Sequence, residues 1–235
     1  MQHRTAGEAC RGLACVVAAF LICATAQAAP FPRAPRVQDA QRAGAPTDSQ
    51  VSEDQLVRDI IARSFPKLSG IDVRLKPFRS ESDYFRTSFS AARFMAGRKM
   101  RYYLLVNPEW RTQGAPAEGV RSILAHELAH IEDLSRGKRM RLFRLTGLLF
   151  KGKTARFERR ADLIALARDY GSGLKAYRAW LYEHVPAEKL PEKRRAYFSP
   201  EEIDAILAAT AQHPDLFDYW LHHVPMTLTD IQTVP

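Results

Sequence analysis

The pattern of apolar and polar positions divides the chain into a short strand-rich part and a long helical part. Apolar and polar residues alternate over 71–78, and strand-like stretches recur within 84–95 and over 101–106, which predicts three strands. The Gly97-Arg98-Lys99 stretch is placed for a hairpin turn between the last two strands. We therefore expect a small antiparallel sheet ahead of the helices.

Helical spacing of apolar residues appears before the sheet and dominates after it. Ser52 and Gln55 form a capping-box pattern in front of a first helix. Gly171 and Gly173 are expected to end a later helix. Strands followed by helices indicate an α+β fold with a mostly helical C-terminal part. In order after Pro116, the predicted helices cover 117–134, 154–170 and 174–184, and a fourth opens at Ser199-Pro200-Glu201-Glu202.

Residues 1–28 have the pattern of a secretion signal. A polar, basic start precedes an apolar run over 13–23, and Ala26-Gln27-Ala28 supplies the small-x-small pattern of a cleavage site. An uncleaved membrane anchor is the alternative, although the apolar run is short for a span. Residues 29–50, rich in Pro and Ala, are expected to be a flexible tether, and residues 51–235 a single domain. We expect an exported protein of the periplasm or the extracellular space.

Composition narrows the chemistry that is available to this domain. The chain has 235 residues, a net charge of +9 and 3 cysteines. All the cysteines lie within 1–28, so the mature chain has no disulfide, thiolate metal site or cysteine nucleophile. The positive charge favours anionic partners. We expect no nucleic-acid partner, because the chain is exported and carries no recognisable nucleic-acid-binding module.

The string His126-Glu127-Leu128-Ala129-His130 lies inside the predicted helix over 117–134. Two histidines four positions apart face the same side of a helix, so both rings can reach one zinc ion. Glu127, next to the first histidine, is placed to take a proton from a water bound to that metal. A catalytic zinc usually needs a third protein ligand, so a further His, Asp or Glu is required.

Glu158 and Asp162 are the strongest further candidates. They share one face of the predicted helix over 154–170, and neighbouring apolar residues turn that face toward the core. Two carboxylates directed at a core need cationic or metal partners. Glu158 as a zinc ligand and Asp162 as acceptor for the ring N–H of a ligand histidine would satisfy both groups. The alternative is a solvated helix face on which Arg159 and Arg160 pair with the two acids.

These two motifs together resemble those of the gluzincin zinc peptidases. The similarity is greatest to the branch that contains HtpX-like and CAAX-prenyl-protease-like enzymes and their soluble exported relatives, and it covers about residues 101–170. The resemblance implies a zincin-like fold in which a small sheet packs on the active-site helix. It also implies one zinc ion per chain, held by His126, His130 and Glu158, with Glu127 as catalytic base and Asp162 behind the ligands.

The resemblance adds two expectations that stay open at this stage. In zincin folds an edge strand above the active-site helix pairs with extended substrate, and residues 101–106 are either that strand or an interior one. Cleavage also needs a donor aimed at the developing oxyanion. The sequence leaves four candidates for this donor in the C-terminal third: Tyr197, Tyr219, His222 and His223.

Residues 136–156 form a basic segment with interleaved apolar residues. The segment contains eight Lys or Arg residues and no acidic residue. Such a segment can bind an anionic membrane surface. The alternative, which we favour slightly, is that its apolar side covers the core while the basic side chains stay in water.

Taken together, the sequence predicts an exported zinc-dependent endopeptidase that hydrolyses peptide bonds of a peptide or protein substrate through a metal-bound water activated by Glu127. A different class of function is the alternative, namely a non-catalytic cell-envelope adaptor or chaperone with a structural zinc site. Glu127 argues against this alternative, because a purely structural site needs no base.

Overall fold

The structure, a computed structural model, describes residues 52–136 and 151–233. Two units are distinguished, 1–50 and 51–235, and all described residues belong to the second. The expected signal peptide and tether, and most of the basic segment over 136–156, therefore lie outside the described residues. Within the described part of the chain, no helix combines the length and apolarity needed to cross a membrane.

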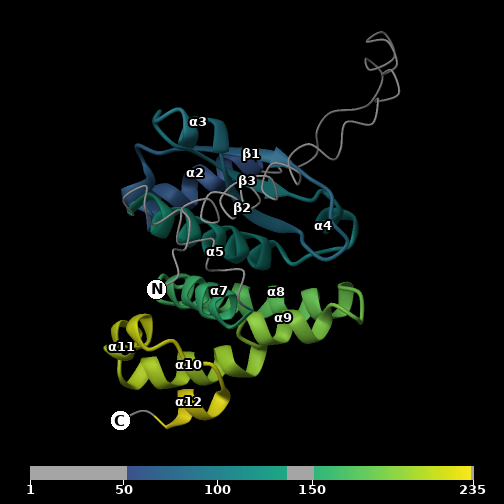
Figure 1. The fold of residues 1–235 in the computed structure, drawn as a ribbon. Helices are drawn as coiled ribbons and strands as arrows, with labels where there is room; N and C mark the ends of the chain where they lie inside the picture. The colour runs from purple at the N-terminus through teal and green to yellow at the C-terminus, as the bar shows by residue number, and fades with distance from the viewer. Residues whose placement is uncertain (1–51, 137–150, 234–235) are drawn as a thin grey trace, which may run out of the picture. The chain divides into compact units, whose positions relative to one another are not determined.

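The described residues form an α+β fold in which a three-stranded sheet precedes a mostly helical remainder (Figure 1). The strands are β1 (Asp72–Pro77), β2 (Phe85–Phe89) and β3 (Arg101–Val106). The helices before, within and directly after the sheet are α2 (Glu53–Ser64), the short 3-10 helix η1 (Pro66–Leu68), α3 (Ala91–Met95) and α4 (Glu109–Thr112). The remaining helices are α5 (Ala117–Arg136), α7 (Lys151–Leu166), α8 (Gly171–His184), α9 (Leu190–Ala196), α10 (Pro200–Gln212), α11 (Leu216–His222) and α12 (Leu228–Gln232).

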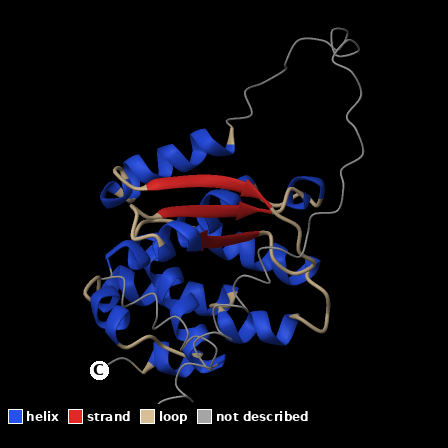
Figure 2. Ribbon diagram, turned by 45° about the horizontal axis from the view of Figure 1, so that its top comes forward, coloured by secondary structure: helices blue, strands red, loops and turns tan. Residues whose placement is uncertain are grey.

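The sheet is mixed, so the expectation of an antiparallel sheet is wrong for one of its strand pairs. Its order is β1-β3-β2, with β3 antiparallel to β2 and parallel to β1 (Figure 2). The parallel pair arises because residues 78–84 carry the chain from one side of β3 to the other. Hydrogen bonds hold this crossing at the end of β3: Phe78 N–H donates to Val106 C=O (3.1 Å), and Asn107 N–H donates to Tyr84 C=O (2.8 Å).

The connection between β2 and β3 also differs from the predicted hairpin turn. The segment expected to be strand over 84–95 divides into β2 and the short helix α3, whose N-terminus is capped by the Ser90 side chain. Gly97 follows α3 with a φ of 68°, a left-handed conformation that glycine adopts without strain. The turn therefore exists at the expected glycine, but it follows a helix.

Capping signals placed the starts of α2 and α10 correctly, whereas α7 and α8 each begin three residues before the predicted start. The Ser52 side chain accepts a hydrogen bond from Gln55 N–H and caps α2. Ser199 and Glu202 form a full capping box at α10. In contrast, α7 ends at Leu166 and Gly171 begins α8, so neither glycine of the 171–173 stretch ends a helix.

Helix α5 lies between the sheet and the C-terminal helices (Figure 1). It packs against β2 on one side and against α7 and α8 on the other. Its apolar stripe is buried, and so are the polar residues of the His-Glu-x-x-His string: the buried members of both sets are Val120, Ile123, Leu124, Leu128 and Ile131, with His126, Glu127 and His130. The His-Glu-x-x-His string therefore lies in the interior, between the sheet and the helices α7 and α8.

Candidate metal centre

Three side chains from α5 and α7 converge on one point. His130 Nε2 lies 3.1 Å from His126 Nε2 and 3.0 Å from Glu158 Oε2, and His126 Nε2 lies 3.3 Å from the same carboxylate oxygen. The two histidines are one helical turn apart on α5, while Glu158 comes from α7, which packs beside it. This group of donor atoms could hold a metal ion.

The donor set fits a zinc ion. Zinc binds His nitrogen and carboxylate oxygen at about 2.0–2.2 Å, so the ligand atoms of a tetrahedral site lie roughly 3.3–3.5 Å apart. The separation of 3.3 Å between His126 and Glu158 reaches this range, and the other two, at 3.0 and 3.1 Å, are slightly shorter. Two imidazoles and one carboxylate leave a fourth position for water or substrate, as in catalytic rather than structural zinc sites. The ring of His130 is held in place by stacking on Phe157, with ring centroids 4.4 Å apart.

Asp162 lies directly behind His126. Its Oδ1 atom is 2.7 Å from His126 Nδ1, and both side chains are almost completely excluded from solvent. The ring N–H is not aligned on this oxygen, so the contact is close but lacks the geometry of a hydrogen bond. A carboxylate in this place favours the tautomer of His126 that leaves Nε2 free to bind a metal.

The charges of the group are strongly coupled. Burial disfavours a charged His126 ring, but Asp162, Glu158 and Glu127 outweigh burial and raise the pKa of His126 to about 9. Burial also disfavours the ionised Glu158, yet His130 and His126 hold the pKa of this carboxyl well below its usual range. The surrounding carboxylates therefore favour a protonated His126 ring, and the two histidines favour an ionised Glu158.

Glu127 follows His126 on α5 and lines a small hollow that is partly open to solvent. Its backbone carbonyl accepts a hydrogen bond from Thr87 Oγ1 (2.9 Å), which ties this point of α5 to β2. Within the described residues its carboxylate forms no hydrogen bond, and the residue as a whole is 5% exposed. This carboxylate is thus available to a small molecule in the hollow.

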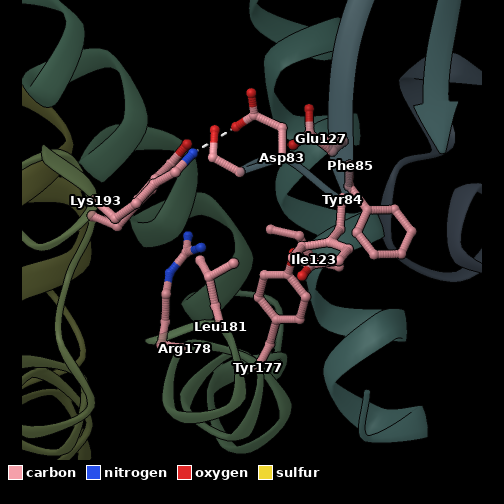
Figure 3. A pocket seen from close by; sticks show the side chains of 11 residues that line it. Asp83, Tyr84, Phe85, Ile123, Glu127, Tyr177, Arg178, Leu181 and Lys193 are labelled. Atoms are coloured by element: carbon pink, nitrogen blue, oxygen red, sulfur yellow. Dashed lines mark hydrogen bonds and ion pairs between the residues drawn. The ribbon is translucent and has the colours of Figure 1, made fainter. Parts of the chain in front are cut away.

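The walls of the hollow come from three parts of the fold (Figure 3). Tyr84 and Phe85 lie on one side with Ile123, and Tyr177 and Leu181 of α8 lie on the other. At the rim, Lys193 Nζ forms an ion pair with Asp83 (2.5 Å), which joins α9 to the loop before β2.

The structure contradicts the alternative arrangement for the second motif. Arg159 pairs with Glu202 at 2.9 Å, and Arg160 pairs with Asp133 at 3.2 Å. Neither arginine pairs with Glu158 or Asp162. The two acids therefore face the histidines and the core, as the metal hypothesis requires.

Of the four candidate oxyanion donors, one reaches the site. Tyr197 lines the hollow together with Glu127, and its ring centroid is 5.9 Å from that of His126. Burial and the nearby Glu158 raise the pKa of Tyr197 well above its usual value, so its hydroxyl stays a donor. Tyr219, His222 and His223 belong to α11 or its end, where both histidines contact backbone carbonyls of that helix.

Sequence reasoning missed Arg178, which is buried beside Asp162. The sequence did indicate that Arg178 is buried, because it shares the spacing of one apolar helix face with Leu174, Tyr177 and Leu181. A charged residue within such a face indicates a buried partner.

Residues 101–106 form β3, which lies between β1 and β2, so the interior alternative is correct for this strand. Within the described residues, β2 pairs on one side only and packs on α5. Comparison of the chain with protein-family models, curated proteins and solved structures finds no match.

Proposed function

We propose that the chain is an exported zinc-dependent endopeptidase of the gluzincin type, with a zincin-like active site. The observation that carries the proposal is a group of three donor atoms 3.0–3.3 Å apart, with Glu127 next to His126 on the same helix and its carboxylate without a hydrogen bond among the described residues. Structural zinc sites are closed by four protein ligands, whereas the described residues supply three and a neighbouring base.

In this proposal His126, His130 and Glu158 would hold the zinc ion, which when bound would supply Lewis-acid chemistry for the hydrolysis of a peptide bond. Glu127 would act as the general base toward the attacking water and then as the proton donor to the leaving amine. Asp162 keeps His126 in the tautomer that binds through Nε2. Tyr197 is the candidate donor to the oxyanion, because it is the one of the four candidates that lines the hollow with Glu127.

The sheet offers a place for the substrate backbone. β2 has one unpaired edge within the described residues, and its Thr87 side chain bonds the carbonyl of Glu127. An extended peptide added to this edge would lie beside the base, and main-chain pairing would give affinity with little sequence preference.

The experiment compares zinc content and cleavage in the purified wild type and Glu158→Ala. We expect about one zinc per chain in the wild type, chelator-sensitive cleavage of an unstructured protein, and loss of both in the variant. Glu183→Ala, an exposed acid on α8, is the matched control and should behave as wild type. A wild type that binds no zinc under non-chelating conditions would refute the proposal.

The burial of the site favours one second candidate, an adaptor or chaperone of the cell envelope whose zinc is structural. His126 is 1% exposed and Glu127 5%, which leaves little room for a substrate unless the hollow widens. One measurement separates the two functions. An adaptor would bind about one zinc per chain but would cleave no peptide, with or without a chelator.

A further inference from the structure

The guanidinium of Arg178 lies inside the protein, behind the metal group. Arg178 belongs to α8, its side chain is 1% exposed, and its Nη2 donates to Asp162 Oδ1 at 2.7 Å. Transfer of a guanidinium from water into a core is costly unless a carboxylate of good geometry compensates it. The place of this cation is therefore set by Asp162.

Asp162 is held from two directions. Its Oδ1 receives Arg178, while its Oδ2 accepts a hydrogen bond from Phe198 N–H at 3.1 Å. The same Oδ1 atom is 2.7 Å from His126 Nδ1. With both oxygens anchored, the carboxylate cannot rotate away from the ring, so the orientation of His126 depends on the group that fixes Asp162.

Arg178 has a second contact, on the side of the hollow. Its guanidinium carbon lies 4.0 Å from the ring centroid of Tyr197, a cation-π distance. Tyr197 in turn lines the hollow that also contains Glu127. One buried cation thus contacts both the residue behind a metal ligand and a wall of the hollow.

We propose that Arg178 is a positioning residue of the metal centre, which fixes His126 through Asp162 and holds the Tyr197 ring at the hollow. The inference rests on the proposed function for the identity of the metal. A role limited to neutralising Asp162 predicts lower stability when Arg178 is replaced. A positioning role predicts in addition a weaker metal site, because ligand orientation is lost.

The test uses Arg178→Met, which keeps the length of the side chain and removes its charge, and Arg178→Lys, which keeps the charge and removes the planar fork. Arg159→Met is the matched control. Arg159 is also buried, pairs with Glu202 at 2.9 Å and contacts the Phe198 ring, but makes no contact with Asp162. Two quantities are measured on the full chain: the affinity for zinc alone, by competition with a chelating dye, and the ring ¹⁵N shifts of His126 in the metal-free protein.

We expect Arg178→Met to weaken zinc binding about 10-fold or more, the range seen when residues behind metal ligands are removed. Arg178→Lys should lose less, and Arg159→Met should lower stability without changing zinc affinity. The His126 ring shifts should change in both Arg178 variants and stay at their wild-type values in Arg159→Met.

Wild-type zinc affinity together with unchanged His126 shifts in the Arg178 variants would overturn the inference. If Arg178→Met does not fold, Arg178→Lys decides by the same two readouts. If the wild type binds no zinc, the proposed function fails. The ring shifts then decide on Arg178 alone: altered shifts support its positioning of His126, and unaltered shifts reject it.

Discussion

Nδ1 of His126 lies 2.7 Å from Oδ1 of Asp162, a contact that joins the middle of α5 to the C-terminal half of α7. His126 and Asp162 belong to different sequence motifs, and neither motif predicts where the other lies in the fold. The contact turns two separate patterns into one site, because the same pair of helices also brings Glu158 within 3.3 Å of both histidines.

Asp162→Asn should weaken both the fold and the metal site. The change leaves the buried Arg178 without a counter-charge, and loss of one partner of a buried pair costs about 3–5 kcal/mol. Zinc affinity should also fall by about 10–100-fold. Asp204→Asn, in an exposed pair with Lys175, should cost less than about 1 kcal/mol. Chemical denaturation and zinc competition measure the two effects, and equal behaviour of both variants would contradict the role of Asp162.

Glu127→Gln should abolish peptide cleavage and leave zinc bound. The amide keeps the size of the side chain but cannot take a proton, and loss of a general base costs about 10²–10⁴-fold in rate. The control is Glu118→Gln, the same substitution at an exposed position in the first turn of the same helix. Single-turnover cleavage and metal analysis of both variants check the prediction, and full activity of Glu127→Gln would show that another group is the base.

Zinc affinity should rise with pH between about pH 6.5 and pH 9. The folded-state pKa of His126 is about 9 and thus above the ordinary value of 6.5, so the protonated ring stabilises the metal-free protein below pH 6.5 and this contribution is lost as the pH rises through 9. Zinc must displace that proton, so the competition weakens as the pH rises. Titration calorimetry in buffers of different ionisation enthalpy should detect proton release at pH 7. Binding without proton release would show that His126 is already neutral.

Gly173→Ala should separate α5 from α8 and destabilise the domain. A Cβ at this position would lie 2.2 Å from Ser122 Oγ and 2.4 Å from the Glu118 carbonyl oxygen, both on α5. Overpacking of this kind costs about 1–3 kcal/mol, and here the backbone must move. At Gly70, by contrast, a Cβ would meet no heavy atom of the described residues within 4 Å, so Gly70→Ala should be tolerated. Urea denaturation of the two variants measures the difference. Equal midpoints would contradict the close approach of the helices.

The local parts of this protein follow from its sequence. A spacing of four residues places His126 and His130 on one face of a helix whatever surrounds it, and the Ser199 and Glu202 side chains cap α10 through contacts within a single turn. The three strands were likewise visible, because alternation is a property of adjacent residues.

The pairing of those elements depended on tertiary structure. Whether β3 is an edge or a central strand depends on how residues 78–84 cross the sheet, and no period in the sequence encodes that path. Arg178 shows the same limit: its place in an apolar stripe indicated burial, but the packing of α8 against α5 and α7 decided that it meets Asp162. Contacts between residues far apart in the chain are set by packing of whole elements, whereas periodicity reports only the face that each element buries.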